Sequence, residues 1–298
     1  MREPGRLITA MVTPFDKKGE VDYDQAKKLA LALLKSGSEG VVLAGTTGES
    51  PTLLHKEEEI TLFKEVKKAV GKKGSIIANT GSNSTAEAVE STQDAEKLGV
   101  DACLLVVPYY NKPSQEGLYQ HFKTIADSTD LPCILYNVPS RTITSLSVET
   151  TIRLSKIPNI IGTKEASGNM DQISRIIKEA KPGFLVWSGN DGDTLPMLAL
   201  GAYGVISVTS HLAGKQMSEM IYSFVKGDVK RAAELHTQLL PLFTSLFLVS
   251  NPQPIKYALN KIGFDVGKPR LPLVEPDAAT AALIDAALKK SQIDLPVK

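Results

Sequence analysis

The stretch Ile160-Ile161-Gly162-Thr163-Lys164-Glu165-Ala166-Ser167-Gly168 begins as a strand and ends as a loop. Its first half is apolar and partly β-branched, which is typical of a strand buried on both faces. Because strand side chains alternate, we expect Ile160, Gly162 and Lys164 on one face, with the lysine near the end of the strand. Burial of a lysine disfavours the charged form and makes a neutral amine available. Such an amine can attack a carbonyl carbon and form an imine. The alternative is an ordinary lysine, whose stem lies on apolar surface while its ammonium reaches water.

Similar apolar runs recur along the first two-thirds of the chain and alternate with helix-like segments. The eight predicted strands are Leu7–Phe15, Gly40–Thr46, Ser75–Thr80, Ala102–Pro108, Pro132–Val138, Asn159–Glu165, Leu185–Ser188 and Gly204–Val208. The segments between them have apolar residues three and four positions apart, as amphipathic helices do, and several begin at a residue type that caps helices. These predicted helices are Asp22–Lys35, Lys56–Val70, three that open at Thr85, Ser114 and Ser147, then Asn169–Ala180, Thr194–Leu200 and Lys215–Val225.

Strict alternation favours parallel strands joined by right-handed crossovers, and eight units predict a closed (β/α)8 TIM barrel. An open doubly wound sheet is the alternative. It would carry a glycine-rich phosphate turn after its first strand, where this chain has Thr13-Pro14-Phe15-Asp16.

The strand signal stops at about Val229, and only helical segments follow. They are Arg231–Phe247, Ile255–Ile262 and Ala278–Lys290, separated by the breakers Asn251-Pro252-Gln253-Pro254 and Lys268-Pro269-Arg270-Leu271-Pro272. We therefore expect a barrel domain over residues 1–226 and a C-terminal three-helix appendage over residues 227–298.

Composition and charge are those of an ordinary globular protein. The 298 residues are 42% hydrophobic and 22% charged, with a net charge of +1. Neither nucleic acid nor a membrane surface is therefore an expected partner. The start, Met1-Arg2-Glu3-Pro4-Gly5, has no apolar signal region, and no run approaches the roughly 20 apolar residues of a membrane span. Cys103 and Cys133 lie in apolar strands, so we expect them to be buried and the protein to be cytoplasmic.

Polar and reactive side chains gather where the predicted strands end, and in such a barrel this rim carries the active site. Besides Lys164, the strand ends read Gly45-Thr46-Thr47-Gly48-Glu49-Ser50, Pro108-Tyr109-Tyr110-Asn111-Lys112-Pro113, Tyr136-Asn137-Val138-Pro139-Ser140-Arg141 and Ser188-Gly189-Asn190-Asp191. Each has an ordinary explanation when taken alone. The glycine-threonine segment suits a turn, the tyrosines suit a core or an interface, and Arg141 suits a surface ion pair. Their convergence on one rim favours a functional site.

The sequence lacks the motifs of metal sites, serine nucleophiles and nucleotide-binding loops. The histidines, at positions 55, 121, 211 and 236, have no second His or Cys at metal-ligand spacing, so no metal site is expected. The sequence contains no nucleophile elbow, Walker loop or dinucleotide fingerprint. Imine chemistry at Lys164 remains.

The rim motifs resemble those of the dihydrodipicolinate synthase and N-acetylneuraminate lyase superfamily of pyruvate-dependent Schiff-base aldolases. Gly45-Thr46-Thr47-Gly48-Glu49, Tyr136 and Gly162-Thr163-Lys164 carry the superfamily resemblance. Pro108–Pro113 and Tyr136–Thr142 are similar to the dihydrodipicolinate synthases in particular. Ser140 stands where that family commonly has glycine, a small change that we expect to be tolerated. Sialic acid lyases usually lack an arginine at the position of Arg141.

The resemblance implies a condensation of pyruvate with aspartate 4-semialdehyde in lysine and diaminopimelate biosynthesis. It implies no cofactor and no metal, because the lysine imine is the electron sink. The implied assembly is a homotetramer built as a dimer of dimers. The implied catalytic residues are Lys164 as the imine-forming amine, Tyr136 as the proton donor and acceptor, and Thr46 and Tyr110 as its relay. The implied substrate-binding residues are Thr47 for the pyruvate carboxylate, Arg141 for the semialdehyde carboxylate, and Gly189 and Ile206.

The same resemblance implies a feedback site for lysine at a dimer-interface cleft. The matching residues are Ser50, His55, Asn83, Glu87 and Tyr109. Glu87 would pair with the ligand's ammonium, and Asn83 and Tyr109 would bind its carboxylate; the alternative is ordinary helix-cap and interface chemistry. Glu58 is a departure, because strongly inhibited relatives carry a second histidine there, and its carboxylate could repel or attract the ligand.

Two other functions remain open from sequence alone. One is a related aldolase that cleaves sialic acid or a 2-keto-3-deoxy sugar acid, against which Arg141 argues. The other is a barrel without catalysis that senses a ligand. Retention of Lys164, Tyr136, Thr46 and Tyr110 together argues against it.

Overall fold

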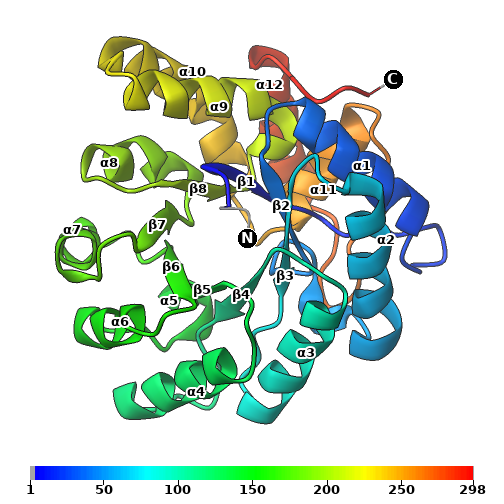
Figure 1. Ribbon diagram of the computed structural model, residues 1–298. Helices are drawn as coiled ribbons and strands as arrows, with labels where there is room; N and C mark the ends of the chain where they lie inside the picture. The colour runs from blue at the N-terminus through cyan, green and yellow to red at the C-terminus, as the bar shows by residue number, and fades with distance from the viewer. Residues whose placement is uncertain (1–3, 298) are drawn as a thin grey trace.

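Eight parallel strands close into a barrel in chain order in the computed structural model, which describes residues 4–297 (Figure 1). The strands are β1 (Leu7–Ala10), β2 (Gly40–Leu43), β3 (Ser75–Asn79), β4 (Ala102–Val106), β5 (Cys133–Asn137), β6 (Ile160–Glu165), β7 (Leu185–Ser188) and β8 (Gly204–Ser207). The predicted (β/α)8 barrel is confirmed, and every strand lies inside its expected run. Met1–Glu3, part of the segment expected to lack a signal region, and Lys298 lie outside the described residues.

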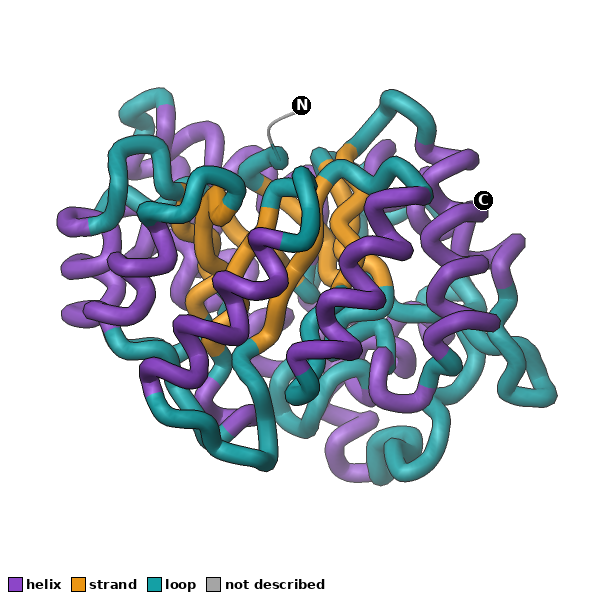
Figure 2. The backbone as a smooth tube through the Cα atoms, turned by 60° about the horizontal axis from the view of Figure 1, so that its bottom comes forward, coloured by secondary structure: helices purple, strands orange, loops and turns teal. Residues whose placement is uncertain are grey.

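Helices surround the strands on all sides, as Figure 2 shows. Those of the barrel are α1 (Tyr23–Lys35), α2 (Ile60–Val70), α3 (Thr85–Lys97), α4 (Gln115–Asp127), α5 (Pro139–Thr142), α6 (Val148–Ser155), α7 (Met170–Glu179), α8 (Thr194–Ala199) and α9 (Ser210–Val225). Ser114 and Ser147 cap α4 and α6 as expected, because each side chain accepts a first-turn N–H. At α3 the cap is Ser84, one residue before the expected Thr85.

The structure departs from the predicted helices at three places. Residues His55–Glu59 form a wide π turn before α2, so the regular helix begins at Ile60 and not at Lys56. Helix α9 begins at Ser210, five residues before the expected Lys215, and is kinked at Ala213. The single turn α5 was missed, because four residues are too few to show a helical period.

The expectation that Ile160 shares a face with Lys164 is wrong. The pairing of β5 with β6 shifts register between Cys133, which lies opposite Ile160, and Ile134, which lies opposite Gly162. Ile161 is therefore the extra residue of a β-bulge, and alternation is interrupted there. Ile160 packs outward with the helices, whereas Ile161 packs against the cluster inside the barrel.

The barrel interior is filled by side chains of every strand. Trp187 is the largest fully buried side chain, and its indole N–H donates to the Gly5 carbonyl (3.0 Å). A Cβ on Gly162 would lie 2.7 Å from the Trp187 ring and 2.3 Å from the Leu185 carbonyl oxygen, so no larger residue fits beside it. Glycine at 162 therefore makes room for the indole directly next to Lys164.

The C-terminal helices pack on the barrel as predicted. They are α10 (Val229–Ser245), α11 (Gln253–Lys261) and α12 (Ala278–Lys290). Leu242, Leu259 and Ile284 from these helices join Leu29 and Phe63 of the barrel helices in one buried cluster. The division at residues 226 and 227 stays a prediction, because this cluster spans both sides of it. Within the described residues, no helix combines the length and apolar character that a membrane crossing requires.

Candidate active site

Lys164 and Tyr136 lie side by side inside the barrel near the carboxyl ends of their strands. They are register partners on β6 and β5, and Lys164 is also paired with Trp187 on β7. The Lys164 Nζ lies 4.3 Å from the centroid of the Tyr136 ring, and both residues are 6% exposed. No carboxylate of residues 4–297 lies within ion-pair distance of this amine. The arrangement gives a buried primary amine with a phenol beside it and no anion to hold it as an ammonium ion.

A buried side-chain brace holds the ends of β5 and β6 together. Asn137 donates its amide to both carboxylate oxygens of Glu165 (3.1 Å each), and the Ser167 N–H donates to the same carboxylate (2.8 Å). Burial raises the pKa of Glu165, partly offset by these hydrogen bonds. The sequence reasoning quoted both residues without giving them a role. A carboxylate directly after Lys164 at the end of a buried strand was the available signal.

The loop after β2 carries Thr46 and Thr47. Thr47 is buried and Thr46 half-buried. The Thr13 hydroxyl donates to the Gly48 carbonyl (2.6 Å), which ties this loop to the end of the segment after β1. A Cβ on Gly48 would lie 3.0 Å from the backbone of Ala44, so the turn is too tight for a larger residue. The predicted turn and the predicted site residues thus coincide.

Gly189 directly follows β7, and Ile206 lies within β8. Ile206 is buried in the interior cluster at β8. Gly189 donates its N–H to the Glu165 carbonyl (2.8 Å), and a Cβ there would lie 2.6 Å from that of Ala166. Gly189 therefore places its backbone against the residue that follows Lys164.

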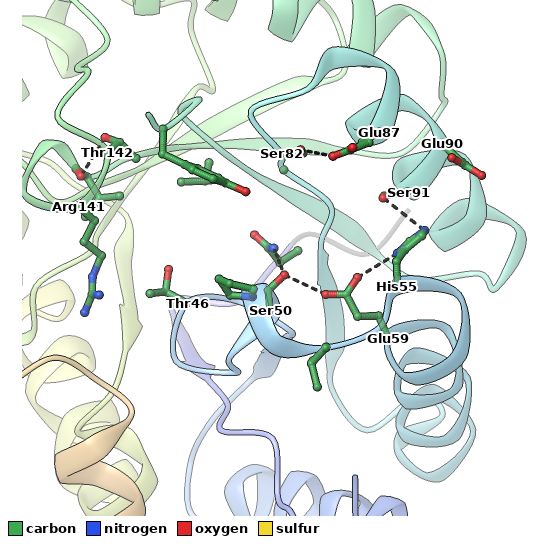
Figure 3. Close-up of a pocket in the computed structure, with 17 residues that line it drawn as sticks. Thr46, Ser50, His55, Glu59, Ser82, Glu87, Glu90, Ser91, Arg141 and Thr142 are labelled. Carbon is green, nitrogen blue, oxygen red and sulfur yellow. Dashed lines mark hydrogen bonds and ion pairs between the residues drawn. The ribbon is translucent and has the colours of Figure 1, made fainter. Parts of the chain in front are cut away.

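A cavity of about 370 Å³ opens at this rim between β2, β3, β4 and β5. Figure 3 shows Arg141 and Thr142 at one end, His55, Glu90 and Ser91 at the other, and Thr46 and Ser50 between them. Arg141 is exposed and forms no ion pair with the described residues, which removes the ordinary explanation given for it. Its guanidinium is therefore available to an anion in the cavity.

Tyr110 stands apart from the other predicted catalytic residues. Its side chain is 88% exposed, and its backbone has φ of +74°, which a non-glycine residue rarely adopts. Lys112, two residues on, also has positive φ (+47°). This loop therefore has a strained backbone and exposes the Tyr110 side chain to solvent.

Four of the five residues of the expected lysine site line the far part of this cavity: Ser50, His55, Glu87 and Tyr109. The fifth, Asn83, supports it, because its side chain donates to the Tyr109 carbonyl (3.1 Å). Glu87 accepts a hydrogen bond from the Ser82 hydroxyl (2.8 Å).

Sequence reasoning missed Glu59, a buried residue of this part. Its carboxylate accepts from the Ser50 hydroxyl (2.8 Å) and lies 2.9 Å from His55 Nδ1. This contact raises the pKa of His55, against the opposing effect of burial. A glutamate four residues after a histidine was the signal available in the sequence.

Glu58 does not face the cavity. Its carboxylate forms two hydrogen bonds with the Arg270 guanidinium (2.6 and 2.7 Å) and accepts the Leu54 N–H (2.9 Å). The expectation that it might repel or attract a ligand in this cleft is therefore not supported, since its charge is already paired.

No group of three or more His, Cys, Asp and Glu side chains within residues 4–297 is arranged to hold a metal ion.

The chain is matched over residues 3–291 by the model of the dihydrodipicolinate synthetase family. The chain belongs to this family. The resemblance of the rim motifs is thereby confirmed.

Relatives within the family are similar over their whole length. A 4-hydroxy-tetrahydrodipicolinate synthase of Dehalococcoides mccartyi is 68% identical over 298 residues, covering 100% of both chains. A crystal structure of the Cyanidioschyzon merolae enzyme with lysine bound is 47% identical, with a TM-score of 0.94 over 96% of this chain and 97% of that one. The Bacillus anthracis dihydrodipicolinate synthase is 46% identical, with a TM-score of 0.94 over 97% and 99%.

Proposed function

We propose that this chain is a lyase that condenses pyruvate with L-aspartate 4-semialdehyde to give 4-hydroxy-tetrahydrodipicolinate, a step of diaminopimelate and lysine biosynthesis. The observation that carries the mechanism is the buried Lys164 amine over the Tyr136 ring, 4.3 Å from its centroid, with no described carboxylate at ion-pair distance. Identity of 68% over the full length of a 4-hydroxy-tetrahydrodipicolinate synthase supports the substrates.

Lys164 attacks the ketone carbon of pyruvate, and loss of water gives an imine. The cationic imine withdraws electrons, so the methyl group loses a proton and becomes an enamine carbon. This carbon attacks the aldehyde carbon of the semialdehyde, and the new alkoxide takes up a proton. The amino group that came with the semialdehyde then attacks the imine carbon, and the bond to the Lys164 nitrogen breaks, which closes the ring of the product and frees the lysine amine. No external electron carrier is consumed in this sequence, so we propose that no cofactor is required.

Tyr136 is placed to exchange these protons, because its ring lies against Lys164 in a buried site. Thr47 and its N–H would hold the pyruvate carboxylate on the loop after β2, and Arg141 would hold the semialdehyde carboxylate at the open cavity end. Gly189 and Ile206 would shape the floor and wall around the bound pyruvate.

Thr46 and Tyr110 would relay protons between Tyr136 and solvent. Tyr110 is 88% exposed and its backbone is strained, so it is available to reach the rim of a second copy. We therefore propose a dimer as the minimal catalytic unit and a homotetramer as the assembly. The cytoplasmic location expected from the sequence likewise stays a prediction.

Imine trapping tests the mechanism. Reduction with borohydride in the presence of pyruvate should add the mass of a reduced pyruvyl group to the peptide that contains Lys164. A label on another lysine, or none, would refute the role of Lys164. A coupled assay with the semialdehyde, run beside assays for pyruvate release from sialic acid and from 2-keto-3-deoxy sugar acids, identifies the second substrate. Activity on a sugar acid alone would mean that the related aldolase reaction is the true one.

We also propose partial feedback inhibition by lysine at the cavity part lined by Ser50, His55, Glu87 and Tyr109. The carboxylate of Glu87 and the buried carboxylate of Glu59 suit an ammonium ligand, and the Cyanidioschyzon merolae relative was crystallised with lysine. Removing Glu87 by Glu87→Ala should weaken inhibition about tenfold, as expected for a lost charge-assisted hydrogen bond. Glu96→Ala, on the same helix but not among the residues that line this cavity, is the matched control. Full activity at tens of millimolar L-lysine would mean that these residues serve only the interface.

A further inference from the structure

The loop that carries Thr46 and Thr47 has an unfavourable backbone conformation at both ends. Two non-glycine residues with positive φ flank it: Ala44 (+49°) and Glu49 (+60°). Such conformations persist only where surrounding contacts impose them. The Glu49 N–H donates to the Thr46 carbonyl (3.2 Å), so the backbone at Glu49 is hydrogen-bonded directly to the site loop.

The carboxylate of Glu49 is fully buried and both of its oxygens face the appendage. Oε1 lies 2.6 Å from Nζ of Lys256, a side chain that is itself only 1% exposed. Oε2 accepts the backbone N–H of Arg270 (2.8 Å), 221 residues later in the chain. These contacts connect the barrel loop to α11 and to the segment that follows it.

Lys256 has no other charged partner among residues 4–297. Its ammonium lies 3.9 Å from the centroid of the Phe15 ring and donates to the Lys268 carbonyl (3.3 Å). Burial lowers the pKa of Lys256 to about 8, although Glu49 opposes this shift. The ammonium therefore remains charged at neutral pH, and the pair acts as an ion pair.

The Arg270 side chain binds the segment that follows this loop. Its guanidinium donates to the carbonyls of Thr52 and Gly19 (2.8 Å each) and pairs with Glu58. We call the contacts of Lys256 and Arg270 with Glu49 and Glu58 the charged clamp. Two cations from the appendage thus bind two carboxylates that flank the turn Ser50–Thr52. Apolar packing alone would serve stability as well as a buried ion pair does. The ion pair differs from apolar packing because it requires one position of the Glu49 carboxylate, and this fixes one backbone conformation at Glu49.

We propose that Lys256, acting through Glu49, is a positioning residue that fixes the Thr46–Thr47 loop for pyruvate binding. This inference rests on the proposed function, in which Thr47 holds the pyruvate carboxylate. It assigns the appendage a part in substrate affinity in addition to its packing against the barrel. Neither Lys256 nor Glu49 touches the substrate.

The test uses the double variant Glu49→Gln/Lys256→Met, which removes both charges and leaves no unpaired ion in the core. The glutamine still offers an acceptor to the Arg270 N–H. We expect KM for pyruvate to rise about tenfold or more, with KM for the semialdehyde within about twofold. The matched control is Lys261→Met, also on α11, which removes an exposed ion pair with Asp285 (2.9 Å) and should leave both KM values unchanged.

Unchanged KM for pyruvate in the folded double variant would overturn the proposal, and so would equal changes for both substrates. If the double variant does not fold, Glu49→Gln alone carries the same test, because Lys256 can then lose its proton and remain buried as an amine. Trapping of the pyruvate imine on Lys164 in the unaltered enzyme is the reference. If the unaltered enzyme forms no imine, the proposed function fails; if it does and KM is unmoved in the variant, only the positioning role fails.

Discussion

Two lysines are buried among the described residues, and each lies over the face of an aromatic ring. Lys256 has a carboxylate 2.6 Å from its Nζ and a phenylalanine ring below it. Lys164 has a tyrosine ring beside it and, within residues 4–297, no carboxylate at ion-pair distance. The two sites differ in the anion, in one hydroxyl group and in the hydrogen bond from Lys256 to the Lys268 carbonyl. A buried lysine with a matched anion is fixed as an ion pair, whereas one without an anion is available for chemistry.

Lys164→Met should abolish turnover, a loss of at least about 10⁴-fold, because no other group at the rim can form the imine. Its free energy of unfolding should not fall, because a buried polar amine is replaced by an apolar side chain of similar length. Lys256→Met should have the opposite effect on the free energy of unfolding. It should lower the free energy of unfolding by about 3–5 kcal/mol, because Glu49 is left buried and unpaired. Coupled kinetics and urea unfolding of both variants check this, and equal stability losses would contradict the contrast.

Tyr136→Phe makes the ring beside Lys164 like the one beneath Lys256. We expect kcat to fall about 10²–10⁴-fold, the usual contribution of a general acid or base, with little change in stability. Steady-state kinetics with both substrates measure this effect. Phe15→Tyr is the control for adding a hydroxyl near the other lysine, and kcat should stay close to that of the parent. A kcat within twofold of the parent for Tyr136→Phe would assign proton transfer to another group.

His211 is a third buried base, and its contacts are complete. Its Nδ1–H donates to the Val208 carbonyl (2.8 Å), and Nε2 accepts the Val12 N–H (3.1 Å). Burial lowers the pKa of His211 from 6.5 to about 4. The unfolded chain therefore takes up a proton at a higher pH than the folded one. Stability contributed by the neutral ring is present above pH 6.5 and is lost as the pH falls towards 4, by about 3 kcal/mol.

Urea unfolding at several pH values should show this loss. In His211→Gln, whose amide does not titrate, the fall in the free energy of unfolding between pH 6.5 and pH 4 should be smaller by about 3 kcal/mol. The same pH dependence in both proteins would show that other groups control acid stability.

Arg141→Ala is expected to give the smallest of these effects. KM for the semialdehyde should rise about tenfold, as expected from the loss of one charge-assisted hydrogen bond, with KM for pyruvate within twofold. Arg153→Ala, which removes an exposed ion pair with Glu116 (2.8 Å), is the matched control. Equal changes in both KM values would mean that Arg141 supports the loop and does not select the substrate.

The barrel could be predicted because each strand and helix carries its own local period. Lys164 and Tyr136 could be placed on one rim because parallel strands end at the same edge. The bulge at Ile161 could not, because register depends on the neighbouring strand and on no local pattern. The short turn α5 falls below the length at which a period can be seen.

The ion pairs of Lys256 and Arg270 could not be predicted from local sequence patterns either. Lys256 appears in the sequence as one more lysine on a short helix, and Glu58 as one more acidic residue in a charged run. Their partners lie about two hundred residues away in the chain, at Glu49 and Arg270. Only the closed fold brings such pairs together. Glu58 was accordingly expected at the ligand cleft and is found bound to Arg270.

The clamp between Glu49 and Arg270 also sets an order of events while the protein is made. A ribosome adds roughly 5–20 residues per second, so the 221 residues between these partners take on the order of 10–40 seconds to synthesise. During that interval the nascent barrel has its threonine loop but lacks the segment that fixes it. The growing chain therefore completes its eight strands before it gains the contact that we propose to tighten pyruvate binding.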